Sequence, residues 1–159
     1  MQLYVIRHGI AGERAPDSDD TARALTDEGH KKVKRVVKGL REVGIKFERI
    51  LASPWVRAAE TADLLAPLCE APPLHTELLC QSPRAALLEM IAKHGTDTAI
   101  VGHEPWLGEL VAWLAFGDTR HREALALKKG GFVWLEGNAI PGGMTLKAFV
   151  PPSFAIAAG

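Results

Sequence analysis

The chain has 159 residues, and lysine plus arginine balance aspartate plus glutamate at 19 each. A chain of this length forms one ordinary domain, and its 47% hydrophobic residues suffice for a substantial core. The even charge excludes a global field that would attract nucleic acid or an anionic membrane. No stretch approaches the roughly 20 apolar residues of a membrane span, and the N-terminus lacks the basic region of a signal peptide. We therefore expect a cytoplasmic protein with no nucleic-acid and no membrane partner, in which Cys69 and Cys80 are ordinary thiols.

The first predicted elements are a strand over residues 3–6, a polar loop over 9–23 and a helix that starts near Thr26 and stops at Gly44. Asp27 and Glu28 suit the first turn of this helix, and valine and leucine side chains follow at helical spacing. The lysines and arginines of the helix form a basic stripe, which we interpret as a solvated face. A strand over 47–52 and a helix over 54–68 come next.

Beyond a turn at Pro72 and Pro73, Ser82 and Pro83 predict the N-cap and first position of a helix over 82–94. A strand over 98–101, a helix from Pro105 and two strands over 132–135 and 145–150 complete the order. Alternation of strands with helices predicts an α/β fold, a single-domain three-layer sandwich with a mostly parallel central sheet and helices on both faces. We expect this domain over residues 1–152 and a frayed C-terminal tail over 153–159.

Chemically active side chains follow three of these strands at their carboxyl ends. Arg7 and His8 leave the first strand, Arg57 lies one helical turn after the second, and His103 leaves the third. Ligands of open α/β sheets bind beyond the carboxyl ends of the strands, so parallel neighbours would bring all four side chains to one crevice. Arginine matches phosphate oxygens, a neutral histidine can act as a nucleophile, and a second histidine can donate to developing charge. The set suits phosphoryl transfer.

Several other chemistries find less support in the sequence. We interpret the remaining histidines as structural or surface residues: His30, His75, His94 and His121. A metal site is not expected, because we identify no carboxylate or thiolate third ligand for His8 and His103, which are flanked by arginines. We interpret the acidic cluster of Asp17, Asp19 and Asp20 as a solvated loop. The sequence contains neither a G-x-S-x-G elbow nor a phosphate-binding G-x-x-x-x-G-K-[ST] loop.

Three motifs in succession resemble the signature of the histidine phosphatase superfamily, which includes the phosphoglycerate mutases. Arg7-His8-Gly9 follows the first strand, and residues 53–62, Ser-Pro-Trp-Val-Arg-Ala-Ala-Glu-Thr-Ala, are similar to the second motif, S-x-x-x-R-A-x-x-T-A. Residues 101–105, Val-Gly-His-Glu-Pro, resemble the third motif, and Leu25-Thr26 with Gly29 resembles the L-T-x-x-G helix start. Within the superfamily the chain most resembles the small SixA-type phosphohistidine phosphatases, which lack the large cap insertions of the mutases.

The resemblance implies a role for each matching residue. His8 would be the catalytic nucleophile, and Arg7, Arg57 and His103 would complete the catalytic set by binding the phosphoryl group. No metal and no organic cofactor is implied. The implied partner is a phosphorylated protein substrate, such as a phosphohistidine-carrying domain in signalling, or a small phosphorylated molecule.

One stretch departs from the mutase-like branch, whose members carry a glutamate general acid in an L-x-E stretch. Here Glu77-Leu78-Leu79-Cys80 places Cys80 at the position of that acid, so mutase activity is not expected. Three hypotheses follow: a phosphohistidine phosphatase, a phosphatase for small phosphate esters with Glu77 as general acid, or a non-catalytic phospholigand-binding module. The intact His8 and His103 argue against the third, because binding alone needs no nucleophile.

Overall fold

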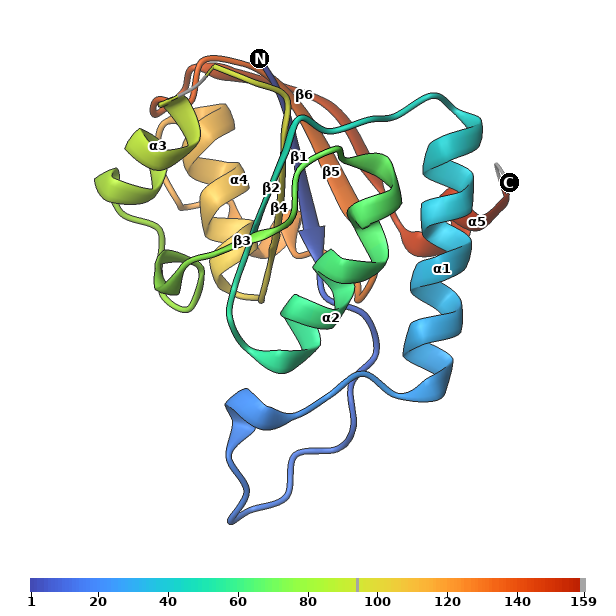
Figure 1. The fold of residues 1–159 in the computed structure, drawn as a ribbon. Helices are drawn as coiled ribbons and strands as arrows, with labels where there is room; N and C mark the ends of the chain where they lie inside the picture. Colours follow the sequence, from blue (N-terminus) through green and yellow to red (C-terminus); the bar gives the residue numbers. More distant parts are fainter. Residues whose placement is uncertain (94, 158–159) are drawn as a thin grey trace.

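A computed structural model describes residues 1–93 and 95–157 (Figure 1). Its centre is a six-stranded sheet of order β3-β2-β4-β1-β5-β6. The strands are β1 (Gln2–Arg7), β2 (Arg49–Ala52), β3 (Leu74–His75), β4 (Thr98–Gly102), β5 (Phe132–Gly137) and β6 (Met144–Val150). The first four of the order pair in parallel, whereas β5 and β6 are antiparallel. The predicted α/β fold with a mostly parallel sheet is confirmed.

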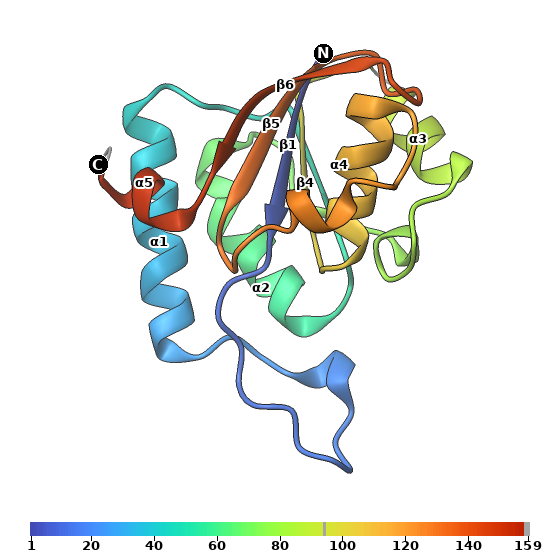
Figure 2. The same cartoon turned by 180° about the vertical axis from the view of Figure 1, so that it is seen from behind.

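Helices cover both faces of this sheet (Figures 1 and 2). One face carries α1 (Asp27–Glu42), α2 (Val56–Leu65) and α5 (Pro152–Ala157), and the other carries α3 (Ala85–Ala92) and α4 (Trp106–Phe116). Short 3₁₀ turns connect them at η1 (Asp20–Ala22), η2 (Ala66–Leu68), η3 (Glu77–Leu79) and η4 (Arg122–Leu125). Within the two described ranges, none of the helices has the length and apolar character needed to cross a bilayer.

The central strands are apolar in their inner residues because helices bury both of their faces. In β1, Leu3 and Val5 point into the core that α3 and α4 cover, whereas Tyr4 and Ile6 point into the core beneath α1 and α2. All four side chains are at most 7% exposed. This two-sided burial fixes β1 at the centre of the sheet and holds its last residues at one defined edge.

The start of α1 is tied to the loop that follows β1. The Thr26 hydroxyl caps the helix by accepting the Gly29 amide hydrogen at 3.0 Å, as its place before Asp27 and Glu28 predicts. Gly29 also lies directly against the backbone of Ile10, because a Cβ atom built on Gly29 would be 2.1 Å from the Ile10 carbonyl oxygen. The L-T-x-x-G stretch therefore fixes the chain two residues beyond His8.

The structure corrects three expectations from the sequence. Ser82 does not cap α3, since Arg84 is extended and the helix begins only at Ala85, with no side-chain cap. The tail over 153–159 is not wholly frayed, because α5 forms and its buried Ala155 packs against α1. The two-residue strand β3 follows the predicted turn at Pro72 and Pro73 and was not expected. The predicted helix end at His94 and the last two tail residues lie outside the described residues.

Gly29→Ala should destabilise the protein by about 1–3 kcal/mol, because its methyl group must displace backbone rather than a flexible side chain. Gly12→Ala, in the loop after β1, is the control, since a Cβ atom there meets nothing within 4 Å. Urea unfolding of the two variants measures the difference. Equal stability of both variants would show that the close approach of α1 to Ile10 does not constrain the fold.

Candidate active site

The carboxyl ends of β1, β4 and β2 lie side by side, because β4 pairs in parallel with both of the others. Backbone hydrogen bonds continue past the strand ends: the His8 amide donates to Gly102 O at 3.1 Å, and the Ser53 amide donates to Val101 O at 2.9 Å. A cavity of about 370 Å³ opens at this edge. It is lined by the four predicted residues, Arg7, His8, Arg57 and His103, and by Arg14, Asp20, Arg23, Trp55, Glu104, Trp106 and Lys129.

The His8 ring is held in one orientation by its own backbone. Its Nδ1 lies 2.7 Å from the Gly9 carbonyl oxygen, which can only accept, so Nδ1 carries the hydrogen and Nε2 the free lone pair. Arg57 Nε donates to that Nε2 at 3.3 Å. Burial is the main cause that lowers the pKa of His8 to about 4; the Gly9 bond opposes the shift, and the neighbouring cations Arg57, Arg7 and Lys129 contribute to it. At neutral pH the ring is therefore uncharged and able to act as a nucleophile.

The second motif places Arg57 against His8 by tying α2 to the loop after β1. The Thr61 hydroxyl accepts the Gly9 amide hydrogen at 3.1 Å and donates to the Arg57 carbonyl oxygen at 2.7 Å. Ala58 and Ala62 are fully buried, and their small side chains let the helix approach the sheet closely. Every fixed position of the S-x-x-x-R-A-x-x-T-A pattern after Ser53 thus serves this contact.

Arg7 lies on the opposite side of the cavity from α2, where its Nη1 donates to Leu127 O at 2.7 Å. Its Nε is buried and has no hydrogen-bond partner among the described residues. Both oxygens of the neighbouring Glu104 carboxylate accept backbone hydrogen bonds, from the amides of Leu127 at 2.7 Å and Gly108 at 3.1 Å. Arg7 therefore retains a donor for an anion in the cavity.

His103 contributes a second neutral imidazole. Its ring centroid lies 5.1 Å from that of His8, and its Nε2 is 2.8 Å from the Ser53 hydroxyl oxygen. Burial, together with smaller contributions from His8 and Arg57, lowers the pKa of His103 to about 3. Two uncharged imidazoles between two guanidinium groups form a pocket that can bind a phosphoryl group and present a nucleophile to it.

Asp20 belongs to this site, although the sequence suggested a solvated loop. It lies in η1, and Arg57 donates to its carboxylate at 3.0 Å and to its backbone carbonyl at 2.6 Å. Arg23 is also 3.0 Å from the carboxylate, and Arg14 is 4.0 Å away. Burial alone would raise the pKa of Asp20, but the summed attraction of these cations holds it below its usual value. The only hint in the sequence was a carboxylate three residues before Arg23 in a loop rich in charge.

Two tryptophans form an aromatic wall of the cavity that the sequence analysis did not single out. The Trp55 ring centroid lies 4.5 Å from that of His103 and 5.8 Å from that of Trp106. The Arg57 guanidinium stacks over Trp55, with its central carbon 4.9 Å from the ring centroid. Trp55 occupies a variable position of the second motif, so the motif alone carries no signal for it.

Cys80 and Glu77 stand apart from the cavity lining. The Cys80 sulfur lies 3.1 Å from the Ser53 hydroxyl oxygen, and the thiol is free. Burial is the main cause that raises the pKa of Cys80, so the thiol stays protonated. Glu77 is exposed at the start of η3 and does not line the cavity. Neither residue occupies the place of a general acid in this pocket.

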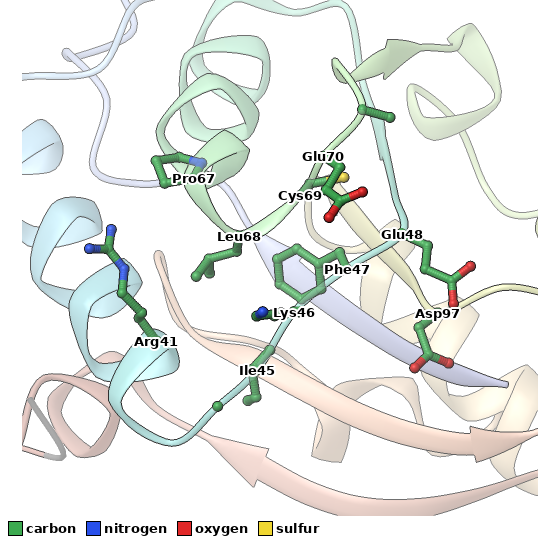
Figure 3. Close-up of a pocket in the computed structure, with 12 residues that line it drawn as sticks. Arg41, Ile45, Lys46, Phe47, Glu48, Pro67, Leu68, Cys69, Glu70 and Asp97 are labelled. Carbon is green, nitrogen blue, oxygen red and sulfur yellow. The ribbon is translucent and has the colours of Figure 1, made fainter.

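A larger cavity of about 950 Å³ lies at the opposite ends of the strands (Figure 3). Phe47, Leu68 and Cys69 form its floor, and exposed charged side chains such as Lys46, Glu48 and Glu70 surround it. It contains none of the predicted site residues, so its size does not identify it as the functional site. In the described part of the chain, no group of three or more histidine, cysteine, aspartate or glutamate side chains could hold a metal ion.

Comparison with known proteins places the chain in a family. Residues 3–82 match the family model of the histidine phosphatase superfamily, branch 1. The chain belongs to the histidine phosphatase superfamily. It is 38% identical over 146 residues to a protein of Picosynechococcus sp., covering 87% of both chains. It is 29% identical over 126 residues to the phosphohistidine phosphatase SixA of Escherichia coli, covering 75% of this chain and 77% of that protein.

Solved structures share the fold at low sequence identity. The structure of the protein histidine phosphatase SixA complexed with tungstate has a TM-score of 0.78 and 24% identity, covering 97% of this chain and 99% of that one. An α-ribazole-5′-P phosphatase of Escherichia coli has a TM-score of 0.72 and 18% identity, covering 96% and 98%. The protein is thus a phosphatase of this superfamily, with a fold found in enzymes for both protein and small-molecule substrates.

The buried neutral histidines make stability depend on pH. Unfolded histidine binds a proton near pH 6.5, whereas His8 and His103 resist protonation until about pH 4 and about pH 3. The contribution of these two histidines to the free energy of unfolding should therefore be fully present above pH 6.5. It should fall as the pH drops below that value, by up to about 1.4 kcal/mol per pH unit for each histidine.

Urea unfolding of the wild type and of His8→Gln between pH 7 and pH 4.5 measures this effect. The slope of the free energy of unfolding against pH should be smaller in the variant, because it lacks one of the two histidines whose pKa is lowered in the folded protein. An unchanged slope would contradict a buried neutral His8.

Proposed function

We propose that the protein is a phosphohistidine phosphatase that works through a phosphorylated His8 and dephosphorylates a histidine presented on another protein. Support for the nucleophile is the His8 ring itself, whose free Nε2 faces the cavity beside Arg57 while Gly9 holds Nδ1. Support for the substrate is the lack of an available general acid among the described residues that line the cavity.

The proposed reaction has two steps. In the first, Nε2 of His8 attacks phosphorus, the bond from phosphorus to the substrate breaks, and the leaving group departs with the bonding electrons. In the second, water attacks the phosphoryl group on His8, the P–Nε2 bond breaks with its electron pair returning to Nε2, and the oxygen and both hydrogens of the water leave with the phosphate as H₂PO₄⁻. Arg7, Arg57 and His103 would bind the oxygens of the transferring group, where charge is spread in the transition state.

The leaving group decides whether a general acid is needed. An alkyl ester leaves as an alkoxide, and protonation of such a group is typically worth about 10²- to 10⁴-fold in rate. A phosphorylated histidine can carry a proton on its other ring nitrogen, so that it leaves as neutral imidazole, whose conjugate acid has a pKa of about 6.5. Of these two leaving groups, only the imidazole of phosphohistidine departs readily without a proton from the enzyme.

The two carboxylates of the cavity are unsuited to give that help. Both oxygens of Glu104 accept backbone amide hydrogens, and Asp20 is held ionised by the arginines around it. Trp55 and Trp106 instead offer an aromatic wall, which favours a flat leaving group such as imidazole. The cavity thus favours N–P over alkyl O–P bonds.

His8→Ala should abolish turnover of an aryl phosphate while leaving the circular dichroism spectrum unchanged. The expected loss is nearly complete, because the variant has no atom to accept the phosphoryl group. His75→Ala is the control, since His75 is exposed in β3 and away from the cavity. Substantial activity of His8→Ala would refute the mechanism. A wild type that binds phosphate but turns nothing over would support the non-catalytic binding module instead.

Turnover of a phosphohistidine protein should exceed that of phosphoserine or 3-phosphoglycerate by about 10²-fold or more in kcat/KM, the contribution of a missing general acid. Aryl phosphates should fall between, because a phenolate leaves more easily than an alkoxide. All substrates are compared with one enzyme preparation.

Glu77→Gln tests the competing hypothesis of a phosphatase for small phosphate esters. We expect it to match the wild type on every substrate, because Glu77 is exposed and does not line the cavity. Equal or better kcat/KM on an alkyl phosphate, lost in Glu77→Gln, would make Glu77 the general acid and the small-ester hypothesis correct.

A further inference from the structure

His103 has one ring nitrogen engaged and one unengaged. Its Nε2 lies 2.8 Å from the Ser53 hydroxyl oxygen, whereas Nδ1 is buried and has no partner among the described residues. The residue lines the cavity beside His8, so Nδ1 is the atom left to meet a phosphoryl oxygen. A neutral imidazole has a single N–H, and it helps only if that hydrogen is on Nδ1, since a bare lone pair would repel the oxygen. The tautomer of His103 therefore matters for the reaction.

The Ser53 hydroxyl controls that tautomer through a simple count of hydrogens. Ser53 is fully buried, and its oxygen contacts three groups: the Trp55 amide at 3.2 Å, the Cys80 sulfur at 3.1 Å and His103 Nε2 at 2.8 Å. The Trp55 amide can only donate, so it fills one of the two lone pairs of the hydroxyl. The single hydroxyl hydrogen then goes either to His103 or to Cys80.

Two observations favour donation to His103. An imidazole nitrogen is a stronger acceptor than a thiol sulfur, and His103 Nε2 lies within ordinary hydrogen-bond distance of the hydroxyl oxygen at 2.8 Å. Burial keeps Cys80 as a thiol, and a side-chain hydrogen bond with Glu77 also raises its pKa, so the thiol hydrogen has two acceptors, the Glu77 carboxylate and the Ser53 hydroxyl. A Cys80 S–H that donates to Ser53 fills the second lone pair and leaves the hydroxyl hydrogen for His103.

We propose that Ser53 and Cys80 are positioning residues, which form a chain Cys80 S–H to Ser53 O–H to His103 Nε2 and so hold the hydrogen of His103 on Nδ1. Cys80 stands where the sequence comparison placed the carboxylic acid of the mutase-like branch. In this chain that position supplies a donor to the wall of the phosphoryl site instead of an acid to the leaving group. The inference rests on contact between His103 and the phosphoryl group and holds for any leaving group.

The direct test is nitrogen NMR of protein labelled with ¹⁵N in histidine, without substrate. His103, assigned by loss of its signals in His103→Gln, should have a protonated Nδ1 and an unprotonated Nε2 in the wild type at neutral pH. Observation of the opposite tautomer in the wild type would overturn the proposal without any variant. This result does not depend on turnover, so it is separable from failure of the proposed nucleophile or substrate.

Variants test the two positions separately, with an aryl phosphate as substrate. Ser53→Ala should give a mixture of His103 tautomers. It should lower kcat/KM by about 10- to 100-fold, because part of the population then has no hydrogen on Nδ1 to donate to the transferring group. Cys80→Ser keeps a donor and should retain both the His103 tautomer and the activity. Cys80→Ala should move part of the His103 population to the tautomer with its hydrogen on Nε2. Cys69→Ala, the other cysteine, is the control and should change neither.

Activity and tautomer must move together for the proposal to stand. Lower activity in Ser53→Ala or Cys80→Ala with an unchanged His103 tautomer would show that the two residues only pack against the site, and it would overturn the proposal. Because Ser53 is fully buried, Ser53→Ala can fail to fold, and in that case the Cys80 pair and the wild-type tautomer decide the question.

Discussion

The hydrogen bond from His8 Nδ1 to the Gly9 carbonyl oxygen, at 2.7 Å, is the constraint on which the chemistry of the site depends. It fixes the tautomer, so that the free lone pair is on Nε2, and it fixes the plane of the ring. Contacts from three other parts of the fold hold residues 8–10 in place. Thr61 binds the Gly9 amide, Gly29 presses against Ile10, and Gly102 accepts from the His8 amide. A sheet buried on both faces makes these contacts rigid.

Charge in the pocket is arranged around His8, whose proposed role as nucleophile requires a neutral ring. Arg57 donates through Nε to His8 and through its other nitrogens to Asp20, so one guanidinium links this histidine to a carboxylate. A phosphoryl group that arrives at Nε2 must share or displace some of these donors. Asp20 therefore helps to hold the Arg57 guanidinium in place beside His8. Arg7 Nε and His103 Nδ1 are buried and have no partner among the described residues.

The sequence allowed much of the fold and the main site residues to be predicted. The apolar runs located five of the six strands, and the parallel order of β1, β4 and β2 explains why Arg7, His8, Arg57 and His103 line one cavity. The helix at α3 was placed too early, because Ser82 and Pro83 form a local helix-start pattern while Arg84 is extended and the helix begins only at Ala85. The strand β3 was missed because two exposed residues carry no periodic signal.

Site residues were missed where the loop geometry, rather than local pattern, brings them in. Asp20 reaches Arg57 from a loop that curls back over the strand ends, a long-range approach that composition cannot reveal. Trp55 and Trp106 sit beside motif residues but at variable positions, so only the packing of their rings against His103 identifies them. Cys80 drew attention only as a departure from the L-x-E stretch, whereas its contact with Ser53 became visible in three dimensions.

The most direct test of the central claim is to locate the phosphoryl group on the enzyme during turnover. Rapid quenching in alkali with a ³²P-labelled substrate, followed by peptide mapping, gives the residue, and comparison with the two phosphohistidine isomers gives the nitrogen. The hydrogen bond to Gly9 predicts label on Nε2 of His8, because Nδ1 carries the hydrogen. Label on Nδ1 of His8 or on His103, or release of phosphate with no labelled histidine, would contradict the account.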